Sequence, residues 1–461
     1  MSDCYREDFY TDELPIAELA AHPERVLGKG ASQATLHYCS PAHGGWGVVR
    51  VALLVPEAHL LFVCPPACGR HGAIAAIEQG YKKRITYLCI NDNEIVLGGY
   101  EAEIERGVRE VMNRVKPRPR ALMIFMSCID DFLGTDHTAA VRQMEAEHGI
   151  PVRLARMNPV SLDTTLPPGI RAQKTMYEFL DIPAHKDRGV IILGAYRPPA
   201  RDAELAEVLR IFGFGPVRHP EFCPDFESFR RMSQSAAALL LRPEGGAAAK
   251  DLTSRLGIPV CTSFMAFDKD TIMERYRSLF AFLGSLGPEE PGSAAVAEAT
   301  EKAESFLTVA RKKAEEREKE ARAVLGATRL AIDSTATIAP FNLALALSKA
   351  GLNVCRIYAN QLPEFERPSL VELARREAGI RVANPNHMRK HGPRPTEPLA
   401  DMAAGFEAGY AAAAPVTVPL AFDEQLFGFE GYTSVLDALM KAAQEGKSDL
   451  RRQVSEYGLV V

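Results

Sequence analysis

The sequence predicts an α/β protein composed of three Rossmann-like, doubly wound parallel-sheet units. Short apolar runs rich in Val, Ile and Leu alternate with stretches of helical spacing, and this alternation favours parallel strands covered by helices. A chain of 461 residues is also too long for one compact core. We therefore expect α/β units at residues 1–187, 188–287 and 327–461, the last with a C-terminal helix, and a linker helix at residues 288–326.

Each unit shows the same succession of short apolar strands and amphipathic helices. In the first unit, strands are expected at residues 60–63, 85–90, 121–127 and 152–157, and helices at 101–114 and 138–147. In the second unit, strands are expected at residues 189–195, 237–241 and 258–262, and a helix at 202–212. In the third unit, strands are expected at residues 329–333, 353–358 and 416–420, and helices at 341–350 and 370–378.

Residues 288–326 differ in composition from the units on either side. The segment opens with Pro-Glu-Glu-Pro-Gly-Ser and continues with Lys, Arg and Glu side chains at spacings of three and four residues. Such mixed charges favour a long, exposed helix. We interpret the segment as a solvated linker helix and hinge between domains, in preference to a dedicated partner-binding surface.

The bulk composition excludes several classes of protein. A formal net charge of -5 gives no basic surface for nucleic acid. The polar, acidic start lacks the features of a secretory signal, and no run reaches the roughly 18 apolar residues of a membrane helix. We therefore expect a cytoplasmic protein that binds neither nucleic acid nor a membrane. Nine cysteines, odd in number and unevenly spaced, do not suggest a disulfide framework.

Three cysteines lie in or beside predicted loops. Cys39 and Cys68 are flanked by Gly and Pro, and Cys128 closes a predicted strand. Ligands of open α/β sheets bind outside the carboxyl ends of the strands, so Cys68 and Cys128 are expected to be neighbours. Each cysteine taken alone is more often a small buried hydrophobic residue. Together, and without the close Cys-x-x-Cys pairs of zinc sites, the three favour an iron–sulfur cluster.

These cysteines and their surroundings resemble the nitrogenase component 1 superfamily. The resemblance spans nearly the whole chain, although recognisable sequence motifs are confined to about the first third. It rests on Cys39 with its Gly-rich follower, Pro65-Pro66-Ala67-Cys68-Gly69, Ile95-Val96-Leu97-Gly98-Gly99, Ser127-Cys128-Ile129-Asp130-Asp131 with Leu133-Gly134, and Phe427-Gly428-Phe429-Glu430-Gly431-Tyr432.

The resemblance implies that Cys39, Cys68 and Cys128 hold a cluster shared with a partner subunit. This iron–sulfur cluster would be P-cluster-like (8Fe) or a simpler 4Fe-4S cluster, with the three α/β units built around it. Cys64 is an alternative ligand, although its position at a strand end favours a structural role. His43 and His71 lie beside the proposed ligands in the sequence. They would donate hydrogen bonds near the cluster, or they are ordinary surface histidines.

The remaining cysteines carry weaker signals. Cys89 and Cys355 lie within apolar strands and are expected in the core. Cys223 and Cys261 are expected to be loop or core thiols, and they are the residues to test if a second cluster is found. The sequence assigns no catalytic residue.

The resemblance also indicates which subunit this chain is. Cofactor-binding relatives supply a cysteine in their middle domain and a histidine in their last, whereas residues 239–246 contain no cysteine and residues 416–427 no histidine. The chain therefore looks like the beta-type, electron-transfer subunit of a heterotetramer with an alpha-type subunit. It also lacks a Gly-x-x-x-x-Gly-Lys-Ser/Thr loop, so ATP would be used only by the partner implied by the resemblance, an iron protein with a 4Fe-4S cluster.

The resemblance also bears on the class of substrate. The sequence does not closely match the nitrogenase or chlorophyll-pathway subunits, and we favour the methylthio-alkane reductase type, which reduces carbon–sulfur bonds. Alternatives are a cofactor-assembly scaffold of the nitrogenase family, a dinitrogenase beta subunit, and a metal-free binding protein built of Rossmann-like units.

Overall fold

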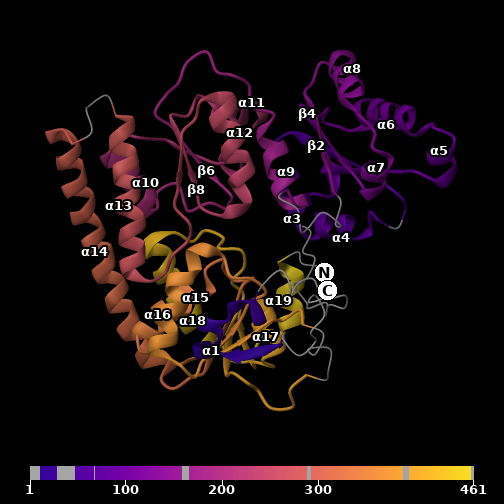
Figure 1. Cartoon of the computed structure of the whole chain (residues 1–461). Coiled ribbons are helices and arrows are strands. Elements are labelled where there is room, and N and C mark those ends of the chain that lie inside the picture. The colour runs from indigo at the N-terminus through magenta and orange to yellow at the C-terminus, as the bar shows by residue number, and fades with distance from the viewer. Residues whose placement is uncertain are drawn as a thin grey trace.

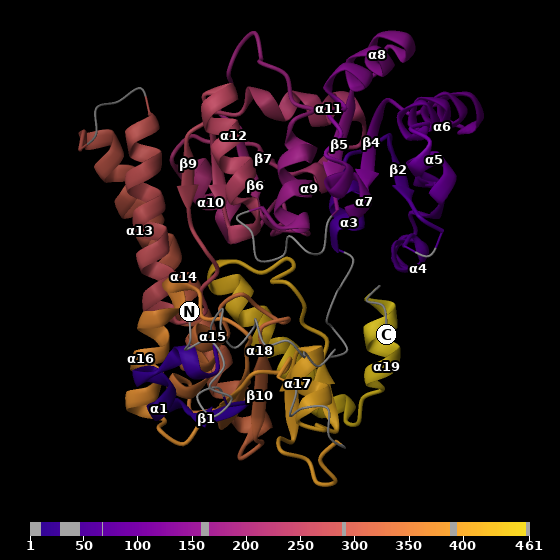
Figure 2. The ribbon, with the colours of Figure 1, turned by 45° about the vertical axis from the view of Figure 1, so that its right-hand side comes forward.

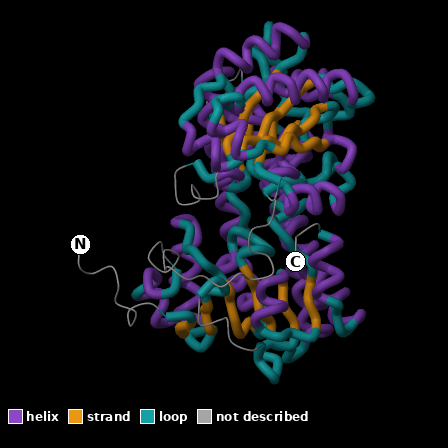
Figure 3. The backbone as a smooth tube through the Cα atoms, turned by 90° about the vertical axis from the view of Figure 1, so that its right-hand side faces the viewer, coloured by secondary structure: helices purple, strands orange, loops and turns teal. Residues whose placement is uncertain are grey.

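The chain contains three sheets of mainly parallel strands covered by helices, which confirms the predicted α/β class. The structure is a computed structural model and describes residues 11–27, 47–66, 68–157, 166–287, 292–387 and 394–457. The sheets have four, four and six strands. The first and second units lie side by side in the upper part of Figure 1, with the third unit below them, and the tube in Figure 3 shows the same division into an upper and a lower lobe.

The first sheet is entirely parallel, with the order β3-β2-β4-β5. All seven residues of β2 are buried, and alternate residues face two different hydrophobic clusters, Leu60 and Phe62 on one face and Leu61 and Val63 on the other. Covering both faces requires an unbroken apolar run, which is why these strands were visible in the sequence. The elements of this unit are α3 (Gly47–Leu53), β2 (Ala58–Cys64), α4 (Arg70–Glu78), β3 (Ile85–Cys89), α5 (Asp92–Val96), α6 (Tyr100–Arg114), β4 (Ala121–Met126), α7 (Cys128–Leu133), α8 (Thr138–His148), β5 (Val152–Arg156) and α9 (Pro168–Tyr177).

The second sheet, with the order β7-β6-β8-β9, is also parallel, and it packs against both other units. Ile191 and Leu193 of β6 pack into the hydrophobic cluster shared with the first sheet, whereas Val190 and Ile192 pack into the cluster shared with the third. The two faces of the second sheet therefore pack against the two other units, one on each face. The elements are β6 (Val190–Leu193), α10 (Glu204–Ile211), β7 (Val217–Arg218), α11 (Phe226–Arg230), β8 (Ala237–Leu240), α12 (Gly246–Leu256), β9 (Val260–Thr262) and α13 (Lys269–Leu286).

The third sheet has the order β1-β12-β11-β10-β13-β14, and its first strand comes from the other end of the chain. β1 pairs antiparallel with β12, and the Glu13 carboxylate accepts hydrogen bonds from Arg356 at 2.6 Å and Arg381 at 2.7 Å. Residues 11–27 therefore lie on the third unit, although the sequence suggested the first. The elements are β1 (Glu13–Pro15), α1 (Ile16–Ala21), β10 (Leu330–Asp333), α15 (Pro340–Lys349), β11 (Val354–Tyr358), α16 (Arg367–Arg376), β12 (Arg381–Ala383), β13 (Met402–Ala404), α17 (Phe406–Ala411), β14 (Val416–Val418), α18 (Gly428–Glu445) and α19 (Leu450–Glu456).

The charged segment predicted as a solvated linker forms the 32-residue helix α14 (Ala294–Leu325), but only one side of it is solvated. α14 runs beside α13 and extends to the third unit (Figure 1), and it also packs against α18. Its buried positions recur at helical spacing, but the charged residues between them hide this apolar stripe, and the sequence therefore predicted a solvated helix. They are Ala303, Leu307, Ala314, Glu318, Ala321 and Leu325.

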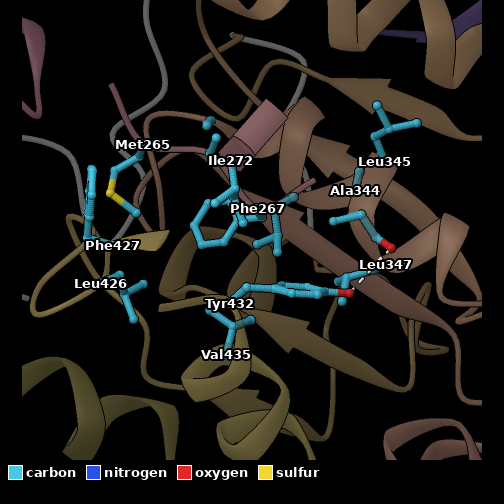
Figure 4. Packing of buried hydrophobic residues seen from close by; sticks show 14 of the residues in the cluster. Met265, Phe267, Ile272, Ala344, Leu345, Leu347, Leu426, Phe427, Tyr432 and Val435 are labelled. Carbon is cyan, nitrogen blue, oxygen red and sulfur yellow. Dashed lines mark hydrogen bonds between the residues drawn. The ribbon is translucent and has the colours of Figure 1, made fainter. Parts of the chain in front are cut away.

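A buried carboxylate anchors this long helix. Glu318 forms an ion pair with Lys269 at 2.6 Å and accepts a hydrogen bond from the Tyr432 hydroxyl at 3.0 Å. Figure 4 shows Tyr432 and Val435 of α18 packed close to Phe267, Ile272 and the α15 side chains. α14 is thus part of the core of the lower lobe. None of the helices in the described ranges is both long and apolar enough to cross a membrane.

This packing predicts a contrast between two aliphatic side chains of α14. Leu307 is fully buried, and Val309 is 53% exposed. Leu307→Ala should lower the free energy of unfolding by about 2–4 kcal/mol, because it removes buried methyl groups and leaves a cavity. Val309→Ala should change it by less than about 0.5 kcal/mol. Urea denaturation followed by circular dichroism measures both, and equal effects would show that α14 is not part of the core.

Candidate functional site

The thiol site lies where strands β2, β3 and β4 end at one edge of the first sheet. Cys64 and Cys89 are the last residues of β2 and β3, and they are direct partners in the parallel register. Cys68 lies in the turn after β2, where its backbone N–H donates to the Pro65 carbonyl at 3.0 Å. Cys128 follows β4 as the first residue of α7. Four cysteines from residues 64–128 therefore lie at the carboxyl edge of this sheet.

Cys68 and Cys128 interact electrostatically, as expected for neighbours. Cys68 is exposed and Cys128 is half-buried. Partial burial raises the pKa of the Cys68 thiol, and the nearby Cys128 thiolate raises it further. Because two thiolates repel each other in this way, a bound cation or positively charged metal cluster would stabilise both deprotonated thiols.

Cys64 lies beneath this surface and is fully buried. Burial, followed by the thiolates of Cys89 and Cys68, raises its pKa to about 12. Gly69 lies directly against it, since an added Cβ would be 2.5 Å from a ring carbon of Tyr87 and 3.3 Å from the Cys64 sulfur. The turn carrying Cys68 therefore requires glycine at position 69, and Cys64 is placed as a packing residue of this turn.

Two of the predicted site residues, Cys39 and His43, lie outside the described residues. His71 lies in α4, but its side chain is not among those described. Within the described part of the chain, no three His, Cys, Asp or Glu side chains form a group that could hold a metal ion. The roles of Cys39, Cys68 and Cys128 as ligands, and of Cys64, His43 and His71 around them, stay predictions.

The expectation that Cys89 is a core residue is wrong. Cys89 is exposed because β3 is the edge strand of its sheet and lacks a neighbour on one side. Cys355 is only half-buried and approaches the backbone carbonyls of Leu330 and Leu399. Cys261 is buried in the core, and Cys223 lies half-buried in the second unit beside a cavity of about 180 Å³.

Large apolar side chains are exposed around the thiol site. They belong to α4, α5, α7 and the residue after α5, which follow the carboxyl ends of β2, β3 and β4 and lie on one side of the first unit (Figure 2). Contiguous exposed apolar surface commonly marks an interface with another molecule. The residues and their exposed fractions are Ile77 at 52%, Val96 at 81%, Leu97 at 82%, Phe132 at 75% and Leu133 at 43%.

A cavity of about 660 Å³ lies among the end of α7, the segment that follows it, α8 and β5. Its lining includes Asp131, Arg142, His137 and Arg156, so it is polar and of mixed charge. His137 and Arg156 also hold the buried carboxylate of Asp130 behind it. Burial alone would raise the pKa of Asp130, but hydrogen bonds from His137 and Arg156 and their charges outweigh burial and lower it.

Comparison with known proteins identifies the family. The model of the family "Nitrogenase component 1 type Oxidoreductase" matches residues 44–437. The chain belongs to this family. Family members are oxidoreductases of multi-subunit complexes that generally include an iron protein, and they typically bind iron–sulfur clusters. A search of curated proteins finds no match.

Solved structures of the nitrogenase component 1 fold superpose on nearly the whole chain. "Nitrogenase Cp1 at pH 6.5" is similar at a TM-score of 0.64 and 14% identity, covering 93% of this chain and 96% of that one. "Nitrogenase Cp1 at pH 5" is similar at a TM-score of 0.60 and 13% identity, covering 94% of each chain. At such low identity these similarities concern the fold.

The donor chemistry of the thiol site fits the iron–sulfur cluster that is typical of the family. Cys68 and Cys128 lie near each other, and their thiols carry sulfur, the ligand atom type that iron–sulfur clusters require. The turn at Cys68 carries a glycine without room for a Cβ, because the Tyr87 ring and the Cys64 sulfur lie against Gly69. The site is also bounded by apolar side chains, which favour a partner surface over free solvent.

The structure also brings together the two segments in which cofactor-binding relatives would supply their cysteine and histidine. Arg242, after β8, forms a buried ion pair with Asp423, after β14, and donates to Glu244 at 2.8 Å. Asp423 also accepts the Ile338 backbone N–H at 3.0 Å. Burial alone would lower the pKa of Arg242, but the carboxylates of Glu244 and Asp423 outweigh it and raise the pKa. An internal ion pair therefore joins these segments in this chain.

The loop carrying Asp423 contacts all three units. Glu424 pairs with Arg50 of α3 in the first unit, and the Gln425 backbone N–H donates to the Arg197 carbonyl of the second unit at 3.1 Å. Phe422, Asp423 and Gln425 have φ values of 55°, 56° and 61°, a left-handed conformation that is costly for residues other than glycine. The contacts across the units thus hold a strained loop.

Proposed function

We propose that this chain is the beta-type, electron-transfer subunit of a cytoplasmic nitrogenase-like reductase of the methylthio-alkane reductase type, acting on carbon–sulfur bonds. The single observation that carries the electron-transfer role is the pair of thiols, Cys68 and Cys128, at the carboxyl edge of the first sheet within an exposed apolar surface. The family, whose members are oxidoreductases in complexes, agrees with this role. The carbon–sulfur specificity is supported by the sequence resemblance.

In this proposal, Cys39, Cys68 and Cys128 ligate a P-cluster-like or 4Fe-4S cluster shared with the partner subunit. Such a cluster accepts and releases single electrons. Cys68 and Cys128 would provide thiolates from two adjacent strand ends, and Gly69 allows the turn carrying Cys68 to pack against Tyr87 and the Cys64 sulfur. Cys64 is an alternative ligand, and His43 and His71 would donate hydrogen bonds around the cluster.

The catalytic cofactor is proposed to lie in the alpha-type partner of a heterotetramer. The buried pair of Arg242 and Asp423 supports this assignment, because it joins the two segments of this chain that lack the cysteine and histidine of cofactor-binding relatives. The remaining partner is an iron protein with a 4Fe-4S cluster, which would use ATP. The absence of a phosphate-binding Gly-x-x-x-x-Gly-Lys-Ser/Thr loop from the sequence supports this division of roles.

Iron analysis tests the ligand assignment. Cys39→Ala, Cys68→Ala and Cys128→Ala should each lower the iron content of the anaerobically purified complex, since each removes a thiolate that cannot be replaced by alanine. The characteristic charge-transfer absorption should fall in parallel.

Two variants provide matched controls for this experiment. Cys89→Ala removes an exposed thiol at the same sheet edge, and Cys355→Ala removes a half-buried thiol in the third unit. Both should retain iron and colour. If all three proposed ligand variants also retain full iron and an unchanged spectrum, the cluster is not bound by these cysteines.

The exposed apolar surface around the thiols is proposed to be covered by the alpha-type subunit, because a shared cluster requires a partner chain at that face. Leu97→Asp and Phe132→Asp each place a charge on this surface. Both should reduce co-purification of an affinity-tagged chain with the alpha-type subunit, because burying an unpaired carboxylate is unfavourable.

Ile182→Asp is the matched control, since Ile182 is 76% exposed but lies after α9, away from the carboxyl edge of the first sheet. It should leave assembly unchanged. Intact assembly of the Leu97 and Phe132 variants would refute the assignment of this face to the alpha-type subunit. If such intact complexes failed only to accept electrons from the iron protein, the face would belong to that partner instead.

A further inference from the structure

Asp130 is the most completely buried charged residue beside the thiol site. It lies in the first turn of α7 with no exposed surface, two residues after Cys128. A buried carboxylate is costly unless hydrogen bonds compensate for the lost water. Such a group in a six-residue helix therefore needs partners from outside that helix.

Three side chains, from α6, from β5 and from the segment before α8, supply these partners. The Tyr100 hydroxyl of α6 donates to one carboxylate oxygen at 3.1 Å, and His137, just before α8, binds the same oxygen at 2.5 Å. Arg156, at the end of β5, donates to the other oxygen at 2.6 Å and also reaches the Thr135 carbonyl. Both oxygens of Asp130 are therefore engaged, and α7 is tied to α6, β5 and the segment before α8.

Cys128 lies between two attachments of the backbone. On its N-terminal side, the Ser127 backbone N–H donates to the Val63 carbonyl of β2 at 3.0 Å. On its C-terminal side, the Asp130 backbone N–H donates to the Ser127 carbonyl at 3.2 Å, and the Asp130 side chain makes the contacts described above. Ser127 caps α7 without a side-chain hydrogen bond. Asp130 is the buried residue of this short helix.

We propose that Asp130 is a positioning residue that sets the direction of the Cys128 thiol through α7. The inference rests on the proposed function for its consequence, a defined geometry at the cluster, but the positioning itself is a property of this chain. An uncharged side chain at position 130 could not accept hydrogen bonds from both Arg156 and His137 as the two carboxylate oxygens do, so some of these donors would lose their partner. α7 would then loosen, and Cys128 would lose its orientation while the strand ladder beneath it remained intact.

Thiol alkylation in the iron-free full-length chain tests the positioning without any cluster. Iodoacetamide labelling, followed by peptide mapping, gives separate rates for Cys128 and for the exposed Cys68, which serves as internal reference. Asp130→Asn should accelerate labelling of Cys128 relative to Cys68 by about fivefold or more, the factor that one lost hydrogen bond of typical strength gives. Tyr100→Phe should give a smaller increase, because it removes one donor of three.

Asp131→Asn is the matched control, since the Asp131 carboxylate makes only a 3.4 Å ion pair with Arg156. It should leave the Cys128 rate unchanged. In the iron-loaded complex, Asp130→Asn should shift the electron paramagnetic resonance lines of the cluster, whereas Asp131→Asn should not. An unchanged rate of Cys128 labelling in folded Asp130→Asn protein would overturn the proposal. If that variant does not fold, an unchanged rate of Cys128 labelling in Tyr100→Phe would overturn it.

The two hypotheses fail separately in this design. Retention of full iron in all three ligand variants would remove the proposed function, but it would leave the alkylation rates and their meaning intact. Conversely, loss of iron in Cys128→Ala, together with wild-type labelling in the Asp130 and Tyr100 variants, would remove only the positioning role.

Discussion

The pairing of β2 with β3 on one side and β4 on the other is the constraint on which the candidate site depends. Parallel strands end at the same edge of a sheet, so the residues that follow them meet there whatever their separation in sequence. The register places Cys64 opposite Cys89 and Val63 opposite Met126, which brings the start of α7 beside the turn after β2. The ladder extends directly into this region, since the Ser127 and Ile90 backbone N–H groups donate to the carbonyls of Val63 and Cys64.

The proximity of Cys68 and Cys128 was predictable because it needs only two strands in one parallel sheet. The exposure of Cys89 was not, because the sequence shows an apolar run without showing that β3 lies at the sheet edge. The hydrogen-bond partners of Asp130 could not be predicted from the sequence either. Tyr100, His137 and Arg156 come from separate elements, and no local pattern indicates that they share one carboxylate.

The same distinction applies to the fold. Buried strands such as β2 and β4 were recognisable because both faces are covered, which demands continuous apolar sequence. β12 and β13, Arg-Val-Ala and Met-Ala-Ala, were not predicted because these short segments hold few β-branched or aromatic residues, whereas the equally short β14, Val-Thr-Val, was predicted. β1 joins the third sheet through pairing with residues near 382, and the pair of Arg242 and Asp423 spans 181 positions, so both depend on the completed fold.

These features combine into one physical account. A parallel sheet gathers the thiols, a buried carboxylate orients the helix that begins at one of them, and an exposed apolar surface surrounds them. The ion pair of Arg242 with Asp423 joins the second and third units in the region where related subunits would bind a cofactor. Taken with the family, this division favours a chain that passes electrons to a partner.

A structure of the anaerobically purified complex at a resolution that separates sulfur and iron is the most direct test of this account. We expect an iron–sulfur cluster at the carboxyl edge of the first sheet, bonded to the sulfur atoms of Cys68 and Cys128 and shared with a partner chain. We also expect that Arg242 and Asp423 remain paired. A cluster bonded to this chain elsewhere, or a cofactor between residues 239–246 and 416–427, would contradict this account.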